Sequence, residues 1–145
     1  FSGRLFATIR EELGKAYTLG GNYVPGIDAG FVYFYVLTTN ENIEKVVGLL
    51  NSEIQKIQNE PVSDQELRDI QSYLKGNYKD DLQTNAALNF VVSLDELYGL
   101  GFNAYQHYAE HIDAVSSEDM KRLAQTYLDL SKSVVVITQS ERISP

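Results

Sequence analysis

Arg10 and Tyr17 lie on either side of a short segment that contains Gly14, and their side chains suit contact with a peptide backbone. The Arg10 guanidinium presents a rigid fork of hydrogen-bond donors to carbonyl oxygens. The Tyr17 phenol can donate one further hydrogen bond. If the two residues flank one tight turn, both side chains can point at the same extended peptide. The plainer interpretation pairs Arg10 with a glutamate on a surface helix and makes Tyr17 an ordinary strand aromatic.

A second stretch that could do chemistry is residues 107–111, H-Y-A-E-H, which matches the H-x-x-E-H motif of inverted zinc peptidases. Histidines at positions i and i+4 of a helix share one face, so His107 and His111 could both bind one Zn²⁺ ion. Glu110 would then be the base that activates a zinc-bound water.

A zinc site of this type needs a third protein ligand, and the sequence after the motif supplies no good one. The acidic residues there are Asp113 on another helical face, Glu118 and Asp119 at a helix start, Asp129 near a helix end, and Glu141 in the tail. The alternative is an amphipathic helix whose solvated face carries both histidines and the glutamate. We expect this surface helix rather than a metal site, and no peptidase activity in the chain alone.

The elements that would position Arg10 and Tyr17 are a helix, a glycine stop and a β-hairpin. Apolar residues recur at helical spacing in the opening helix, namely Leu5, Phe6, Ile9 and Leu13. Gly14 suits a left-handed C-terminal cap of this helix. A strand over about residues 17–24 follows, and the turn residues 25–30 join it to a second strand over Phe31–Thr39.

Helical patterns fill most of the remaining chain. Apolar spacing predicts helices from Thr39 or Asn40 through residue 58, from Ser63 to about Leu82, over 86–98, over 103–115, and from Ser116 to about Leu128. The aliphatic run Ser133–Thr138 predicts a third, buried strand. Three clear strands and grouped helices predict an α+β fold, in which an antiparallel or mixed sheet has helices packed on one face. We expect residues 1–145 to form a single domain.

The composition excludes several classes of partner. The chain has 145 residues, with 12 Lys or Arg against 20 Asp or Glu, and its net charge of −8 argues against nucleic acid and against an anionic membrane. The absence of cysteine excludes disulfides and thiolate metal sites. No apolar run approaches the roughly 20 residues of a membrane-spanning helix. The chain begins at Phe1 and enters a helix almost at once, so we expect it to be a fragment of a longer protein.

The segment from Ser2 to Tyr17, with the pattern S-x-R-L-F-x-x-x-R-E-x-L-G-x-A-Y, resembles the pitrilysin/insulinase-type zinc metallopeptidases. This family includes the mitochondrial processing peptidases. Further agreement comes from Asp28-x-Gly30-x-x-x-x-Tyr35, Ser63–Leu67, Ile112-x-x-Val115-Ser116-x-Glu118-Asp119 and the Val134–Ile137 strand. The likeness covers nearly the whole chain, and its specific element is the R-x₆-Y spacing from Arg10 to Tyr17.

The resemblance implies paired, homologous α+β domains that enclose a peptide chamber, with the zinc motif on the N-terminal domain. This chain is similar to the later half of a C-terminal domain, where the family has no zinc site at the position of H-Y-A-E-H. The resemblance further implies that Arg10 fixes the peptide backbone. It implies that Tyr17 donates to the scissile carbonyl oxygen, a catalytic contribution by electrostatic preorganisation. No cofactor is expected in this fragment, and zinc is expected in the parent protein on another domain.

Three functions are therefore to be compared. The first is a non-catalytic domain that binds a peptide substrate together with an N-terminal catalytic domain or a homologous subunit. The second is a scaffold or interaction module of an inactive family member, and the third is the self-contained zinc site of His107, Glu110 and His111. The upstream strands of family domains are absent, so we also expect self-association through an exposed sheet edge. A periplasmic location would fit a bacterial origin.

Overall fold

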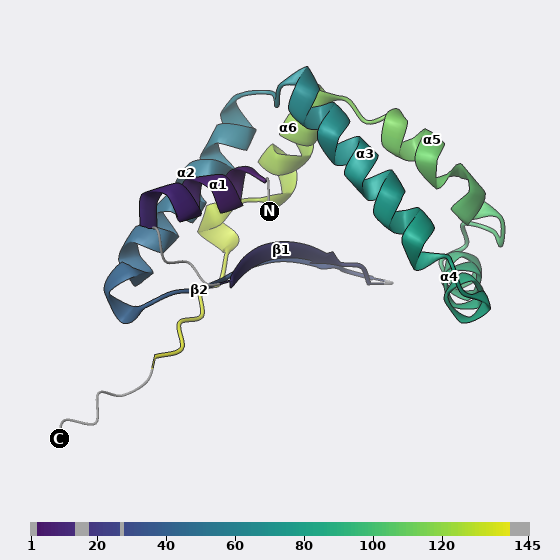
Figure 1. The fold of residues 1–145 in the computed structure, drawn as a ribbon, viewed down its shortest axis with the longest axis horizontal. Coiled ribbons are helices and arrows are strands. Elements are labelled where there is room, and N and C mark those ends of the chain that lie inside the picture. Colours follow the sequence, from purple (N-terminus) through teal and green to yellow (C-terminus); the bar gives the residue numbers. More distant parts are fainter. Residues whose placement is uncertain (1–2, 14–17, 27, 140–145) are drawn as a thin grey trace. The chain divides into compact units, whose positions relative to one another are not determined.

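The computed structural model describes residues 3–13, 18–26 and 28–139 (Figure 1). They fall into two compact units. The first unit combines residues 1–59 with residues 124–145, and the second unit spans residues 60–123. None of the helices in the described residues combines the length and apolar character that crossing a membrane requires.

The N-terminal part of the first unit contains two helices and a hairpin. Its elements are α1 (Arg4–Leu13), β1 (Thr18–Val24), β2 (Phe31–Leu37), the 3₁₀ turn η1 (Asn40–Asn42) and α2 (Ile43–Asn59). Helix α1 lies beside α2 (Figure 1). Ile9 of α1 is completely buried, and Val46 and Ile54 of α2 are buried as well. The apolar faces of these two helices therefore supply the core of the first unit.

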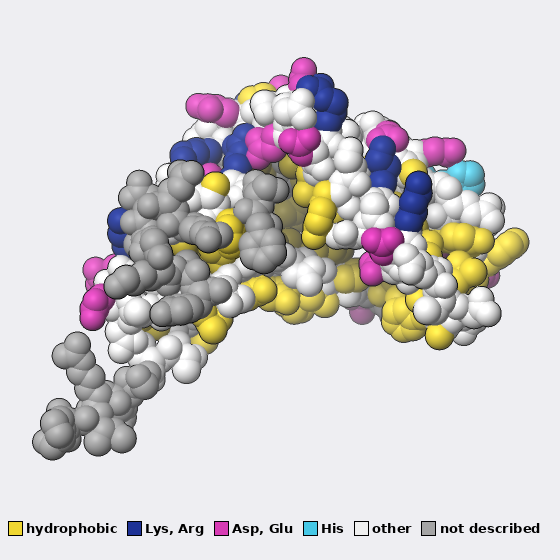
Figure 2. Space-filling model, viewed as in Figure 1, with side chains coloured by type: hydrophobic (Ala, Val, Ile, Leu, Met, Phe, Trp, Pro, Cys, Tyr) yellow, Lys and Arg dark blue, Asp and Glu magenta, His cyan; other side chains and the backbone are white. Residues whose placement is uncertain are grey.

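The predicted β-hairpin is confirmed. Strands β1 and β2 pair antiparallel in a register that runs from Thr18 opposite Leu37 to Val24 opposite Phe31. A Cβ atom added to Gly20 would lie 2.8 Å from the Tyr35 hydroxyl oxygen, so glycine leaves room for the ring of its cross-strand partner. Hydrophobic side chains lie open on the surface over this hairpin (Figure 2).

The prediction of three clear strands is wrong. Among the described residues the sheet has only two strands, and Ser133–Thr138 belongs to neither. Ser133 has the backbone angles of a strand (φ −79°, ψ 150°), but a sheet also needs a neighbouring strand to exchange N–H and C=O bonds. An aliphatic sequence favours the extended conformation without supplying that neighbour. The molecule is α+β in character, mostly helical, with one open hairpin.

The second unit is helical. It contains α3 (Asp64–Asp81), α4 (Asn85–Leu97), the 3₁₀ turn η2 (Ala104–His107), α5 (Tyr108–Asp113) and the first part of α6 (Ser117–Tyr127). The caps predicted at Ser63 and Ser116 are confirmed, since their hydroxyl oxygens accept hydrogen bonds from the Glu66 and Asp119 amides at 3.2 and 3.1 Å. The helix predicted over 103–115 is present but begins as a 3₁₀ turn.

The chain returns to the first unit at the end of α6. The Gln58 Nε2 atom on α2 donates to the carbonyl oxygens of Ala124 (3.3 Å) and Leu128 (2.9 Å). Gln125 in turn donates its Nε2 hydrogen to the Gln58 carbonyl oxygen at 2.7 Å. These bonds hold the end of α6 against α2, and the short turn η3 (Leu130–Lys132) then leads into the extended segment 133–139.

Candidate functional site

Helix α1, which carries Arg10, is fixed to α2 by a polar contact as well as by Ile9. The Thr8 hydroxyl donates to Glu53 Oε1 at 3.1 Å. Lys56 Nζ donates to the same oxygen at 2.6 Å, and Glu53 is only 5% exposed. A buried carboxylate needs such donors, because an unpaired one would be costly to desolvate. The contact therefore fixes the orientation of α1 on α2, and α1 precedes the predicted substrate-binding turn.

Arg10 lies in α1, but its side chain is outside the described part of the structure, as are Gly14 and Tyr17. The described elements on either side are the predicted ones, since α1 extends to Leu13 and β1 begins at Thr18. Residues 4–13 of the opening motif thus form α1, and the described chain resumes in the first strand of the hairpin. The substrate-contacting roles of Arg10 and Tyr17 stay predictions.

The H-Y-A-E-H motif lies at the junction of η2 and α5, on the surface of the second unit. His107 Nδ1 and Glu110 Oε2 are 3.0 Å apart, and both side chains are exposed. The imidazole rings of His107 and His111 are 6.4 Å apart, centre to centre. Between them in sequence, Tyr108 stacks on Tyr78 of α3 with ring centres 3.8 Å apart. The motif therefore occupies an amphipathic helix that packs through its tyrosine.

Several acidic residues considered as a third zinc ligand have other partners. Asp113 pairs with Lys75 of α3. Asp119 binds Ser116 and Arg122, and these hydrogen bonds hold the pKa of its carboxyl well below the ordinary value. Asp129 binds Ser131 and Lys132, which likewise lower its pKa. Within the described residues, no group of three or more metal-ligating side chains could hold a metal ion.

The tyrosine stack is a second place in this unit where the pKa of a side chain is shifted. Burial raises the pKa of the Tyr78 phenol, and the nearby Asp95 carboxylate and the tyrosines Tyr108 and Tyr105 raise it further. The Asp95 Oδ2 atom is itself buried and has no hydrogen-bond partner among the described residues. Burial and the nearby Asp95 charge both favour the uncharged form of the Tyr78 phenol. At neutral pH Tyr78 therefore serves packing, through its stack on Tyr108.

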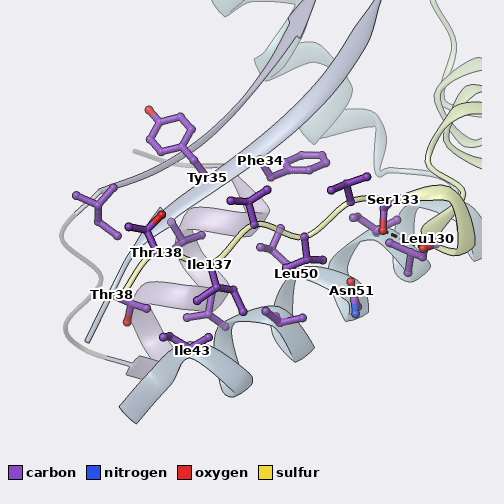
Figure 3. Close-up of a pocket in the computed structure, with 18 of the residues that line it drawn as sticks. Phe34, Tyr35, Thr38, Ile43, Leu50, Asn51, Leu130, Ser133, Ile137 and Thr138 are labelled. Carbon is purple, nitrogen blue, oxygen red and sulfur yellow. Dashed lines mark hydrogen bonds between the residues drawn. The ribbon is translucent and has the colours of Figure 1, made fainter. Parts of the chain in front are cut away.

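The first unit contains a hollow that sequence reasoning did not identify. It has a volume of about 680 Å³ and lies between the end of β2 (Phe34–Leu37), the inner face of α2 and the segment 133–138 (Figure 3). The α2 side chains in its wall include Ile43, Val46 and Leu50. We call this hollow the apolar groove, since none of the residues that line it carries a charge. The aliphatic run of residues 133–138, predicted as buried, was the one sequence signal for it.

Comparison with known proteins identifies the first half of the chain. Residues 1–74 match the model of the peptidase M16 inactive domain family. An uncharacterized zinc protease of Rickettsia bellii is 33% identical over 76 residues, which is 52% of this chain. The match spans only 18% of that relative's length.

Solved structures share the fold at low sequence identity. The inactive peptidase domain of a zinc-protease-type protein from Bordetella parapertussis superposes with a TM-score of 0.75 at 19% identity, over 90% of this chain and 70% of that one. A zinc-protease-type protein from Bordetella pertussis gives 0.74 at 18% identity, over 90% and 71%. The periplasmic protease PqqL from Escherichia coli gives 0.67 at 16% identity, over 86% and 14%. The family model matches residues 1–74, which make up half of this chain. The chain therefore belongs to the peptidase M16 inactive domain family.

Proposed function

We propose that the chain is the non-catalytic C-terminal domain of a zinc metallopeptidase and helps to enclose and bind the peptide substrate. The observation that carries this proposal is the extent of the family match, residues 1–74, which contains both Arg10 and Tyr17. The zinc ion would belong to another domain of the parent protein or to a homologous subunit. The relatives support this division, because one is a zinc protease and another is an inactive peptidase domain.

The described geometry supports a rigid placement for the proposed substrate contacts. Ile9 and Thr8 fix α1 through the core and through Glu53. The ladder from Thr18 to Val24 fixes β1 against β2. A binding group gains most when its scaffold is already ordered, since less freedom is lost when the substrate arrives. Arg10 and Tyr17 both adjoin scaffold of this kind.

The two residues would play different chemical roles. In our proposal Tyr17 donates its hydroxyl hydrogen to the scissile carbonyl oxygen, whose negative charge grows as the peptide bond is attacked. Such a bond is stronger in the transition state than in the bound substrate, so it lowers the barrier. Arg10 would donate to peptide carbonyls away from the reacting bond, where the charge stays constant, and would serve binding alone.

The test is the kinetics of Tyr17→Phe in the full-length parent enzyme. Loss of one such donor typically lowers kcat by about 10²–10³ with KM nearly constant. The control is Tyr33→Phe, since Tyr33 is an exposed aromatic of the same hairpin, on β2, and should show unchanged kinetics. Wild-type kinetics in Tyr17→Phe would remove Tyr17 from the active site and leave it an ordinary strand residue.

A further inference from the structure

We infer that Glu53 is a positioning residue, whose buried carboxylate sets the orientation of α1 in which Arg10 binds the peptide substrate. The inference rests on the proposed function, since it needs Arg10 to contact the substrate. It goes further because it gives a buried residue of α2 a role in substrate affinity that stability alone does not explain. Three features of the first unit carry it.

The first feature is the burial of a charge. Glu53 is 5% exposed, and among the described residues it is the only buried side chain that is polar or charged. Taking a carboxylate out of water is costly, and the bonds that it then makes often do no more than offset this cost. A well-packed apolar side chain at position 53 would hold the two helices together at least as well. The carboxylate therefore points to a role other than stability.

The second feature is the direction of the bonds that Glu53 makes. Its Oε1 atom accepts hydrogen bonds from the Thr8 hydroxyl of α1 and from Lys56 Nζ of α2. The buried side chain of Ile9 also holds α1 in the core, but the hydrophobic effect has no direction. A hydrogen bond weakens steeply as its angle departs from linear, so the bond from Thr8 resists rotation and sliding of α1. Lys56 holds the acceptor oxygen in place.

The third feature is the spacing of positions 8 and 10 along α1. In a helix with 3.6 residues per turn, two positions further on correspond to a rotation of about 200°, so positions 8 and 10 lie on nearly opposite sides of α1. A contact that fixes the rotation of α1 at Thr8 therefore also fixes the direction in which position 10 faces. A displacement of about 1 Å at a substrate contact can lower the rate by about 10²-fold. The orientation of α1 therefore matters for binding through Arg10.

The experiment replaces the polar contact by an apolar one in the full-length parent enzyme. The double variant Thr8→Val/Glu53→Met removes donor and acceptor together and keeps side chains of similar volume. Replacing both partners of a hydrogen bond by apolar groups of the same shape is often nearly neutral for stability, so we expect the urea midpoint of the enzyme to stay unchanged. The KM for a quenched fluorogenic peptide that the wild-type enzyme cleaves should rise about three- to tenfold, because α1 is no longer fixed in rotation. The value of kcat should fall less.

Control variants separate positioning from folding. Glu53→Gln keeps an acceptor oxygen for the Thr8 hydroxyl, so its KM should stay within about twofold of wild type. Gln71→Met removes two hydrogen bonds in the second unit and should lower stability there, but it should leave both kinetic constants unchanged. If the double variant folds poorly, Thr8→Val and Thr8→Ser repeat the comparison with single changes, because only serine keeps the donor.

A double-mutant cycle with Arg10→Ala shows whether Glu53 acts through Arg10. Two changes that act through one contact are not additive, whereas independent changes add. The Thr8→Val/Glu53→Met change should therefore raise KM in the wild-type background and have little further effect once Arg10 is alanine. A general loss of order in the first unit would raise KM in both backgrounds.

Three outcomes would overturn the inference. They are a wild-type KM in Thr8→Val/Glu53→Met, an equal rise in KM with and without Arg10, and a rise of the same size in Gln71→Met. Arg10→Ala, measured in the same assay, tests the proposed function separately. If Arg10→Ala raises KM and the change at Thr8 and Glu53 does not, only the positioning role fails. If Arg10→Ala has a wild-type KM, the substrate-binding role fails and the positioning role fails with it.

Discussion

Thr8 and Glu53 are joined by a hydrogen bond of 3.1 Å between positions 45 residues apart in the sequence. The bond connects the middle of α1 to the buried side of α2, and Lys56 reinforces it from the next turn of α2. The opening helix is thus fixed in orientation by a polar contact as well as by apolar packing. The proposed substrate-binding role of Arg10, which lies in α1, would depend on that orientation.

Thr8→Val should weaken the attachment of α1. Valine keeps the shape of the side chain but removes the donor, so the Glu53 carboxylate stays buried and, among the described side chains, keeps its bond to Lys56. A hydrogen bond to a charged group typically contributes about 1.5–3 kcal/mol, and we expect a loss of this order in the free energy of unfolding. Urea denaturation measures it. Thr8→Ser retains the hydroxyl and should lose less than half as much; an equal loss would show that the methyl group matters instead.

Arg10→Ala in the parent enzyme should raise KM about tenfold while kcat falls less. The reason is that Arg10, in the proposed role, binds peptide carbonyls equally in the ground state and the transition state. Steady-state kinetics on a peptide substrate gives both constants. Arg68→Ala is the control, because Arg68 bonds the side chain of Gln65 on the exposed surface of α3. Unchanged kinetics in Arg10→Ala would end the substrate-binding assignment.

The stability of the second unit should fall in alkali because of Tyr78. Its pKa is raised in the folded state, chiefly by burial, relative to the ordinary value of about 10. A group with a raised folded pKa contributes stability that is complete below its unfolded pKa and is lost as the pH rises through its folded pKa. We therefore expect stability to decline above about pH 10. Tyr78→Phe should decline less steeply, as followed by denaturant titration at several pH values. The same slope in both proteins would contradict the assignment.

Gln71→Met should loosen the end of α5. The Gln71 Nε2 atom donates to the carbonyl oxygens of Ile112 (3.0 Å) and Val115 (3.1 Å), at the end of the helix where carbonyl groups lack their full set of helical donors. Methionine fills a similar volume without a donor, so we expect a loss of about 1–3 kcal/mol. Hydrogen exchange should accelerate around residues 112–115.

Gln106→Met is the matched control for that change, because Gln106 is exposed and its side chain bonds the hydroxyl of its neighbour Tyr105. It should alter stability by less than about 0.5 kcal/mol. If Gln106→Met and Gln71→Met were equally destabilising, the loss of stability could not be assigned to the two hydrogen bonds from Gln71 to the carbonyl oxygens.

Local signals in the sequence predicted the local structure well. The caps at Ser63 and Ser116 depend on side chains that bond an amide three residues away, so the sequence contains both partners. The hairpin depends on two β-rich runs and a turn between them. The H-Y-A-E-H motif was interpreted as a surface helix from its apolar spacing, and Tyr108 does pack on α3.

Long-range features could not be predicted in the same way. The aliphatic run of residues 133–138 indicated a strand, but its pairing depends on a neighbour that no local pattern specifies. The apolar groove is built from β2, α2 and this distant segment, so its existence depends on tertiary packing. Arg10 and Tyr17 were singled out by spacing, and kinetics must establish what they contact.

The division of the chain into a continuous and a discontinuous unit has a consequence for its synthesis on the ribosome. Residues 60–123 emerge as one uninterrupted stretch, so the second unit can close while translation continues. The first unit cannot, because Gln58 must wait for Ala124 and Leu128 before its amide finds its two carbonyl partners. The residues of α2, which precede the second unit in the sequence, therefore reach their final structure after it.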